Sequence, residues 1–357
     1  YKNSYDYNTK HADIKYSFDN KYLLQLTLTS LIKSVNPDIH NLYPSANFIW
    51  AVKQEKFIKK IDWLSKLNFK MGYQKQNSHY NFKIIFDPGK SHLKYYHAGI
   101  DFGIFENKLT GSFDIYKKKR KEITDDEYWY EKITAELEQK GLNFSLQSTV
   151  IDKKNISVDI GFNMATYYNL FSSDAESYFF NLPDNFQDNI YNYPGYPLNS
   201  FLVARQVYSE EGMPLEGVYQ YNDSITNYWP YYGGMSFFKD PEPNVTLGFY
   251  TSICFNDFDF SLTSRAWINN YVYNEYAAYY SPYEELLYYG NFPQNIMKYE
   301  TNFNTRQTYS SYYVENASFL KIDQITLGYD FNKLLGNKFG IRIYSTIHNA
   351  FIFSNYQ

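Results

Sequence analysis

Residues 314–356 read VENASFLKIDQITLGYDFNKLLGNKFGIRIYSTIHNAFIFSNY. A run rich in Ile, Leu, Phe and Tyr ends at Phe331, a polar segment spans Asn332 to Lys338, and a second run extends from Phe339 to Phe353. Each run is longer than the usual strand of about 5–6 residues, and neither holds the ~20 consecutive apolar residues of a membrane helix. Long, half-alternating strands with aromatic ends are typical of outer-membrane barrels. The stretch therefore predicts a hairpin of two long antiparallel strands.

The composition favours a barrel over a bundle of membrane helices. Among 357 residues, 41 are tyrosine and 29 are phenylalanine, and aromatic residues make up 21%. Tyrosine suits surfaces that are apolar at one end and wet at the other, such as the belts at membrane interfaces. A mean hydropathy of -0.55 argues against membrane helices but not against a barrel, because half of each barrel strand faces a polar lumen.

Period-two alternation recurs along the chain and predicts further hairpins. Between Gly141 and Val150, apolar residues alternate with polar ones, and residues 156–164 (ISVDIGFNM) repeat the pattern after a polar turn. The second of these strands carries an uninterrupted apolar face that has no apparent core partner. We expect this face to contact lipid, through Ile156, Val158, Ile160 and Phe162.

The connections between the predicted strands alternate in length. Short ones are expected at residues 19–21, 55–66 (with a short turn of helix), 106–108, 152–155, 256–257 and 332–338, and longer ones at 34–44, 77–92, 121–140, 169–242 and 271–313. Short periplasmic turns and long extracellular loops characterise outer-membrane barrels. The fold class predicted is therefore all-β, with about twelve strands of a large up-and-down antiparallel barrel. Residues 1–357 are expected to form one partial barrel domain, with long extracellular loops at about 169–242 and 271–313 and no plug domain in this chain.

The sequence contains no recognisable catalytic or metal-binding motif. The six histidines are scattered, and His92 and His97 would point to opposite faces of a strand. The acidic run 125–127 lacks the spaced oxygen ligands and the glycine of a calcium loop, and we find neither a phosphate-binding glycine loop nor a Gly-x-Ser-x-Gly elbow. A net charge of -4 offers no broad basic surface for nucleic acid. We expect neither an enzyme nor a cofactor nor a nucleic-acid partner.

The long loops hold the candidate contact residues. One loop places three tyrosines and a tryptophan beside Gly233 and Gly234, and the other repeats paired tyrosines. Aromatic side chains with polar tips stack on sugars, grip peptides or serve protein interfaces, and they can equally pack loops against one another. The candidates for contact with a ligand or partner are Tyr228, Trp229, Tyr231, Tyr232, Tyr279 and Tyr280.

Several stretches also resemble a known family. The opening at residues 314–321, the sequence Ile-Thr-Leu-Gly-Tyr at 325–329 and the sequence at 349–356 are similar to the C-terminal region of the SusC/RagA family, which are TonB-dependent outer-membrane transporters of Bacteroidota. The passage with Tyr43-Pro44-Ser45, Trp50, Glu55 and Phe57 resembles the same family. Residues 29–34 depart from it, because they lack the Arg-x-Asp-Gly-Ser element that is common there.

The resemblance implies a location and partners. Such proteins are multi-pass barrels of the cell outer membrane with 22 strands and an N-terminal plug. They import oligosaccharides or peptides, draw energy from TonB and carry a SusD-like lipoprotein on their extracellular loops. By this resemblance the chain is a portion of the barrel that lacks strands on each side, and TonB would act through a region before Tyr1.

Two other interpretations remain open. The chain could be a family member that serves as a scaffold in a larger outer-membrane assembly without transport, as the departure at residues 29–34 allows. It could also be an unrelated barrel or a soluble β-rich adhesin. A plug with a TonB-binding segment upstream of Tyr1 would favour transport over the scaffold.

Overall fold

The computed structural model describes residues 7–33, 36–78, 90–125, 132–173, 180–181, 190–221, 224–226, 234–284, 303–331 and 340–356. The chain divides into two compact units. The sheet unit comprises Tyr1–Ala175, Asn244–Ile268 and Phe319–Ser354, and the loop unit comprises Glu176–Pro243, Asn269–Ser318 and Asn355–Gln357.

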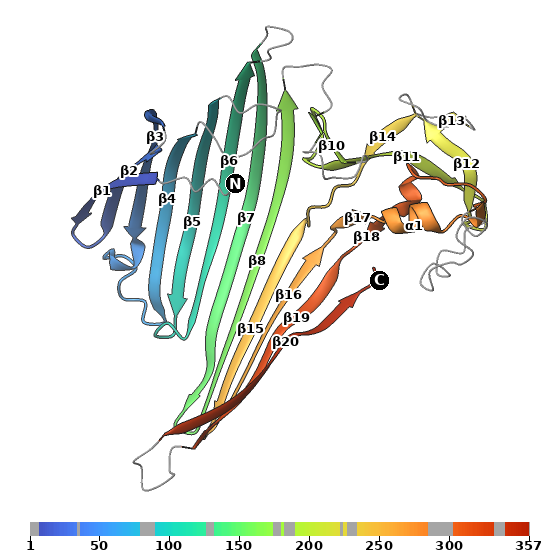
Figure 1. Cartoon of the computed structure of the whole chain (residues 1–357). Helices are drawn as coiled ribbons and strands as arrows, with labels where there is room; N and C mark the ends of the chain where they lie inside the picture. The colour runs from blue at the N-terminus through green and yellow to red at the C-terminus, as the bar shows by residue number, and fades with distance from the viewer. Residues whose placement is uncertain are drawn as a thin grey trace. The chain divides into compact units, whose positions relative to one another are not determined.

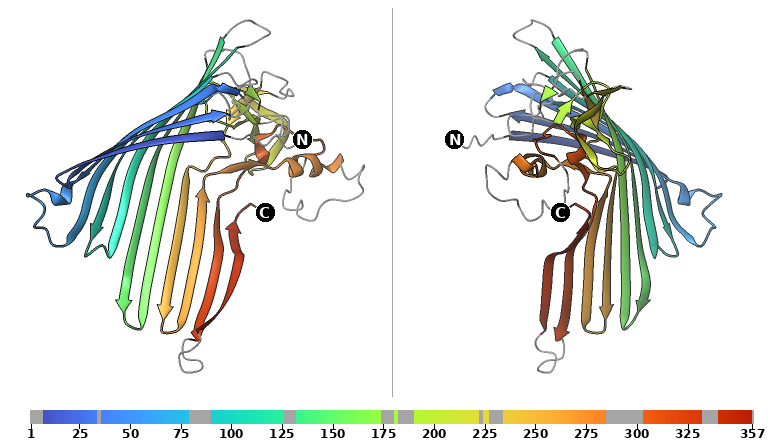
Figure 2. Two further views of the ribbon diagram at one scale, coloured as in Figure 1. Left: turned by 60° about the vertical axis from the view of Figure 1, so that its left-hand side comes forward. Right: turned by 90° about the vertical axis from the view of Figure 1, so that its right-hand side faces the viewer.

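The sheet unit is a single antiparallel sheet of twelve strands in chain order, so the predicted all-β class with about twelve up-and-down antiparallel strands is confirmed. Figure 1 shows the strands following one another from blue to red, and Figure 2 shows that the sheet is strongly curved. The strands are β1 (Tyr7–Phe18), β2 (Tyr22–Lys33), β3 (Asn36–Ala51), β4 (Leu64–Ser78), β5 (Lys90–Ile104), β6 (Leu109–Asp125), β7 (Lys132–Lys153), β8 (Ile156–Ser173), β15 (Val245–Phe255), β16 (Phe258–Ile268), β19 (Phe319–Phe331) and β20 (Ile341–Ser354).

The last residues of β1, β3, β5, β7, β15 and β19 lie at one end of the sheet, which we call the turn end. The last residues of β2, β4, β6, β8, β16 and β20 lie at the opposite end, which we call the loop end. At the first turn, Asp19 and Asn20 both have a φ of 51°, and the Lys21 amide donates to the Phe18 carbonyl at 3.0 Å. This is the type I′ geometry whose twist matches that of a hairpin.

Several strands extend further than the sequence predicted. Residues 36–44 belong to β3, residues 121–125 and 132–140 to β6 and β7, and residues 169–173 to β8, so the longer loops expected at 34–44 and 121–140 are wrong. The ladder continues there through polar residues, where no apolar periodicity marks a strand. In the connection expected at 55–66, a 3-10 turn, η1 (Val52–Gln54), precedes a single helical turn, in which the Lys59 amide donates to the Glu55 carbonyl at 2.8 Å, and β4 begins at Leu64.

The sheet has two chemically different faces. Directly paired residues share a face, and one row of such pairs runs Phe18, Tyr22, Trp50, Phe69, Ile100, Phe113, Phe144, Met164, Leu247, Ala266, Leu320 and Phe353. We call this side of the sheet the apolar face. The other side, the polar face, carries the alternating partners such as Asp101, Ser112 and Asn163. The four residues predicted to contact lipid, Ile156, Val158, Ile160 and Phe162, lie on the apolar face.

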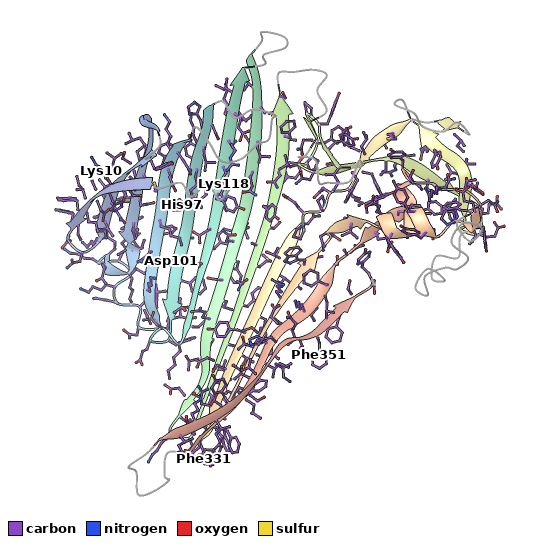
Figure 3. The ribbon with its side chains drawn as sticks, viewed as in Figure 1. Lys10, His97, Asp101, Lys118, Phe331 and Phe351 are labelled. Carbon is purple, nitrogen blue, oxygen red and sulfur yellow. The ribbon has the colours of Figure 1, made fainter. Side chains whose placement is uncertain are left out.

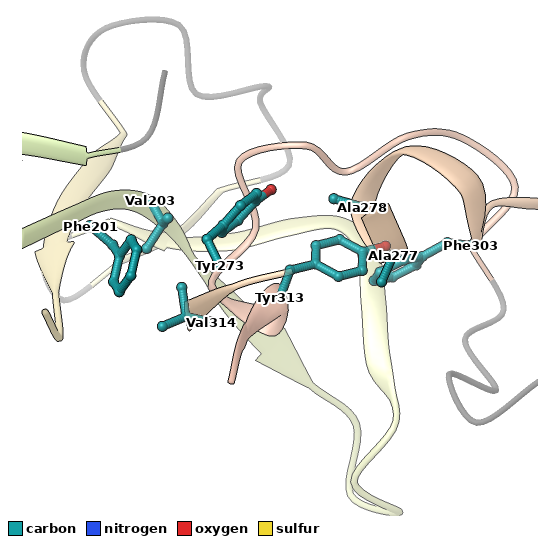
Figure 4. Close-up of a cluster of buried hydrophobic side chains, with 8 residues drawn as sticks. All are labelled: Phe201, Val203, Tyr273, Ala277, Ala278, Phe303, Tyr313 and Val314. Atoms are coloured by element: carbon teal, nitrogen blue, oxygen red, sulfur yellow. The ribbon is translucent and has the colours of Figure 1, made fainter. Parts of the chain in front are cut away.

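The loop unit has its own small sheets. Six strands form one sheet, namely β9 (Phe180–Asn181), β10 (Ile190–Asn192), β11 (Ser200–Tyr208), β12 (Pro214–Tyr221), β13 (Ser224–Thr226) and β14 (Met235–Phe238), and β17 (Tyr271–Tyr273) pairs with β18 (Val314–Asn316). A helix, α1 (Glu275–Tyr280), and a 3-10 turn, η3 (Ser311–Tyr313), complete the unit. Figure 4 shows its core, in which eight side chains are buried: Phe201, Val203, Tyr273, Ala277, Ala278, Phe303, Tyr313 and Val314.

Candidate functional site

The apolar face is bounded by aromatic side chains at both ends. At the turn end, neighbouring rings of Phe18, Tyr22, Trp50 and Phe69 have centroids 6.0 to 6.4 Å apart. At the loop end, one row contains Tyr73, Tyr96 and Tyr168, with the first two rings 5.0 Å apart.

The height of the apolar face on β5, from the turn end of the strand to the tyrosine row, fits a membrane. From Ile104, at the turn end of β5, to Tyr96 is eight residues, or about 27 Å along a strand. A tilt of 35–45° reduces this to about 20 Å of thickness, close to the apolar band of about 25 Å between the girdles of an outer-membrane barrel. The apolar face thus has the chemistry and the height of a lipid-facing surface.

On the polar face, some side chains contact each other across an intervening strand. Lys70 on β4 contacts Asp101 at 2.8 Å and reaches past β5 to Asp114 on β6 at 2.9 Å. Arg342 on β20 donates to both oxygens of Asp259 on β16, at 2.6 and 3.2 Å, across β19. Figure 3 labels His97, Asp101 and Lys118 of this face, together with Phe331 and Phe351 of the apolar face.

A glycine in the intervening strand makes each such contact possible. His97 Nε2 lies 3.3 Å from Asn47 Oδ1, and a Cβ on Gly72 between them would lie 2.2 and 2.3 Å from these atoms. Gly99 and Gly328 stand in the same relation to Asp114 and Asp259, each 2.2 Å from a carboxylate oxygen. The polar face is therefore a connected layer of charged and amide groups, suited to a hydrated passage.

Glu55 organises the turn between β3 and β4. Its carboxylate accepts hydrogen bonds from the Tyr22 hydroxyl at 2.8 Å and the Trp50 indole at 3.2 Å, and Lys21 lies 3.6 Å away. The hydrogen bonds from Tyr22 and Trp50 lower the pKa of Glu55. The Trp-Glu part of the motif thus anchors the aromatic row at the turn end, whereas Phe57 is 74% exposed.

Gln307 and Gln206 connect distant parts of the loop unit. The buried Tyr219 hydroxyl donates to Gln307 Oε1, which also accepts from the Gly217 amide at 3.2 Å. Gln206 Nε2 donates to the Leu215 carbonyl at 2.6 Å, and its Oε1 accepts from Ser310 Oγ at 2.7 Å. Burial raises the pKa of Tyr219, which keeps its hydroxyl available as a donor.

Glu216 fixes the segment that follows residue 302. Its carboxylate accepts from the Thr305 amide at 2.8 Å, the Thr305 hydroxyl at 2.6 Å, and the Asn304 amide and side chain at 3.1 and 3.3 Å. Burial acts to raise the pKa of Glu216, but these hydrogen bonds outweigh it, so the pKa lies below its ordinary value. A single carboxylate thus holds two residues almost ninety positions later in the chain.

Helix α1 presents a group of tyrosines. The side chain of Asn274 caps the helix by accepting from the Ala277 amide at 2.9 Å, and Ala277 and Ala278 are buried. The opposite side carries Tyr276, Tyr279 and Tyr280, which are 50, 37 and 38% exposed. The rings of Tyr276 and Tyr280 lie 4.9 Å apart, and the Arg306 guanidinium lies 5.3 Å from the Tyr279 ring centroid.

The structure describes two of the six predicted contact residues. Tyr279 and Tyr280 lie together on α1, whereas Tyr228, Trp229, Tyr231 and Tyr232 lie outside the described residues. The sequence analysis missed Tyr276 and Arg306. The run EYAAYYSPY, with two alanines among tyrosines, carried the signal for Tyr276, but no local signal placed Arg306 beside Tyr279.

Metal-binding clusters and membrane-spanning helices were the other features sought. Among the described residues, no group of three or more His, Cys, Asp or Glu side chains is arranged so that it could hold a metal ion. Nor do the described residues form a helix of the length and apolar character needed to cross a membrane.

Comparison with known proteins identifies relatives. No family model matches the chain. It is 26% identical to the TonB-dependent receptor SusC of Bacteroides thetaiotaomicron over 96% of its length, which is 40% of that protein. It is 22% identical to the TonB-dependent receptor P39 of Formosa agariphila, over 97% of this chain and 42% of the relative. The structure of the RagAB peptide transporter matches with a TM-score of 0.77 at 18% identity, over 99% of this chain and 44% of that one.

These relatives confirm the resemblance to the SusC/RagA family: the chain is a homologue of SusC. It spans about two fifths of the length of the curated relatives it matches. The relatives are receptors and transporters, so the prediction that the chain is not an enzyme is confirmed, as is the predicted outer-membrane location.

Proposed function

We propose that this chain forms part of the barrel wall of a TonB-dependent importer of oligosaccharides or peptides that works with a SusD-like surface lipoprotein. The observation that carries the proposal is the two-faced sheet of twelve strands, with one face apolar between aromatic rows and the other crossed by charged and amide groups. The names of the relatives, TonB-dependent receptors and a peptide transporter, support it. TonB would supply the energy for import.

The two faces and the loop unit have different roles in this proposal. The apolar face contacts lipid, and the polar face lines the passage that the substrate crosses. The turn end faces the periplasm, and residues 174–242 and 271–313 form the extracellular loops of one partial barrel domain. The aromatic residues of these loops contact the substrate or the lipoprotein, namely Tyr228, Trp229, Tyr231, Tyr232, Tyr279 and Tyr280.

Uptake by the whole protein tests the function. The gene is deleted in its host, and uptake of labelled oligosaccharide and peptide mixtures is compared in the deletion strain, the complemented strain and a strain depleted of TonB. We expect uptake of one substrate class to be lost on deletion, restored by complementation and lost again without TonB. If the complemented protein reaches the outer membrane and binds its partners, but neither class enters the cell in a TonB-dependent manner, the scaffold interpretation replaces the proposal.

The role of helix α1 has its own test. The double variant Tyr279→Ala/Tyr280→Ala removes two exposed rings, and rings at the centre of an interface contribute about 1–2 kcal/mol or more each. We expect the whole protein to bind its substrate or its co-purifying lipoprotein about 30-fold or more weakly. Ile225→Ala on β13 is the matched control, because Ile225 is a 68% exposed apolar side chain of the same unit. Equal binding by the double variant and the control would contradict a contact role for α1.

A further inference from the structure

The apolar face becomes strongly basic near the loop end of β4 to β7. Direct pairing places Lys75, Lys94, Lys119 and Glu138 in one row, Tyr96, Lys117 and Lys140 in the row nearer the turn end, and Lys121 and Glu136 in the next row outward. These six lysines and two glutamates leave an excess of four positive charges on four neighbouring strands. We call this surface the lysine patch.

The two glutamates form ion pairs with three of the six lysines of the patch. Glu138 lies 2.7 Å from Lys140, 2.9 Å from Lys117 and 3.0 Å from Lys119, and Glu136 lies 2.9 Å from Lys119. Three ammonium groups are thus held around one carboxylate. The other three, Lys75, Lys94 and Lys121, form no ion pair within the described part of the chain. Lys94 and Lys121 are exposed.

The patch lies at the depth of lipid headgroups. Its first row contains Tyr73, Tyr96 and Tyr168 beside Lys117 and Lys140. Tyrosines in this position mark the boundary between the hydrocarbon and the headgroups of a membrane. The lysines therefore begin where the apolar band ends, at the level where lipid phosphates lie.

An apolar groove adjoins the patch. Its lining surface is almost entirely apolar. The residues that line it are Ala12, Ile14, Leu26, Thr27, Leu28, Pro44, Ser45, Ala46 and Tyr73. Small side chains at Ala12 and Ala46 hollow the surface between larger neighbours. Tyr73 belongs both to this groove and to the first row of the lysine patch, and Lys75 follows it on the same face of β4. A chain of CH₂ groups can therefore lie in the groove while its headgroup reaches the lysines.

We propose that the lysine patch and the groove bind an anionic membrane lipid whose phosphate groups give its headgroup a net negative charge, with the phosphates on the ammonium groups and an acyl chain in the groove. The charge excess requires an anionic headgroup, and the continuity with the apolar groove selects a lipid over a soluble anion. The inference rests on the proposed function in one respect, because it needs the apolar face to contact lipid.

The experiment removes Lys75, Lys94 and Lys121, the three lysines of the patch that form no ion pair with another described residue. The whole protein is purified in a mild detergent as wild type, as Lys75→Gln/Lys94→Gln/Lys121→Gln, and as Lys56→Gln/Lys59→Gln/Lys60→Gln. The second triple variant is the matched control, because it removes three exposed lysines from the turn between β3 and β4. Mixed micelles are titrated with diphosphoryl lipid A or with phosphatidylcholine, and bound lipid is measured by native mass spectrometry. Inorganic phosphate alone is titrated in parallel.

We expect the patch variant to bind the diphosphoryl lipid about 100-fold more weakly, at about fivefold per lysine, and the control variant to bind it as wild type does. A fourth variant, Ala46→Trp, fills the groove and should weaken binding of the lipid. Equal binding by the patch and control variants, equal binding of phosphatidylcholine, or binding of inorganic phosphate as tight as that of the lipid would overturn the proposal. Heat-modifiable migration of each variant is measured first, to show whether the barrel is folded. Failure of the wild type to form a barrel would count against the proposed function. A folded barrel without lipid selectivity would count only against this inference.

Discussion

A charge placed at Phe162 tests whether the apolar face contacts lipid. Phe162 lies on β8 six residues from Ile156, beside the turn, and six residues from Tyr168, in the aromatic row at the loop end. Each interval is about 20 Å along the strand and, with a tilt of 35–45°, about 15 Å of depth. This is half of a hydrocarbon core of ~30 Å, so Phe162 should lie near the midplane.

The depth sets the expected cost of the substitution Phe162→Arg. An arginine at the midplane of a lipid-facing strand costs about 2–4 kcal/mol, and near the interface it costs about 0–1 kcal/mol. The equilibrium constant for unfolding should therefore rise about 30- to 1,000-fold for Phe162→Arg, and much less for Tyr168→Arg. The loss of the ring, whose centroid lies 6.2 Å from that of Phe144, is measured separately with Phe162→Ala.

The assay is reversible unfolding of the whole protein in lipid vesicles, followed by tryptophan fluorescence and by heat-modifiable migration on a gel. Asn163→Arg is the matched control, because Asn163 is an exposed neighbour on the polar face at the same depth. Its cost should stay within about 0.5 kcal/mol, as at other surface positions. If Asn163→Arg and Phe162→Arg have the same cost, or if cysteines at Ile156, Val158, Ile160 and Phe162 are labelled from water, the apolar face does not contact lipid.

Two further predictions concern single contacts. Gly72→Ala should destabilise the sheet by about 1–3 kcal/mol, as overpacking does, because its Cβ would lie 2.2 Å from His97 Nε2. Denaturant unfolding should show a larger decrease in the free energy of unfolding than for His97→Ala. An equal decrease for the two variants would contradict the steric account. Glu216 should stabilise the loop unit above a pH of about 4.5 and lose that contribution as the pH falls through its lowered pKa. Hydrogen exchange of residues 303–310 should therefore accelerate in acid in the wild type, whereas Glu216→Gln should exchange rapidly at neutral pH too; unchanged protection in that variant would refute the role of the carboxylate.

The sheet was predictable because two-residue alternation is local. Leu142, Phe144 and Leu146 reveal a strand and its apolar face without reference to any other part of the chain. Strand ends were less predictable, because the ladder of β3 continues through polar residues 36–44, whose composition also suits a loop. The short strands of the loop unit were missed for the same reason.

The loop unit and the lysine patch depend on contacts between distant residues. Glu216 meets Thr305 and Asn304 from 88 or 89 positions away, and no periodicity signals such a contact. In the sequence, the run Lys117–Lys121 indicates only a basic segment of one strand. Only the pairing of β5, β6 and β7 shows that Lys94, Lys119 and Glu138 share one row.

The glycines that lie beneath the contacts across an intervening strand have a consequence for the register of strand pairing. A strand that slides by two residues keeps its apolar side chains on the apolar face, so alternation alone does not fix the register. Sliding β4 by two residues would replace Gly72 with Lys70 or Gln74 beneath the contact between His97 and Asn47. Gly72 therefore helps to fix the register of β4. In this part of the strand, only glycine leaves enough space for the contact between His97 and Asn47 that crosses it.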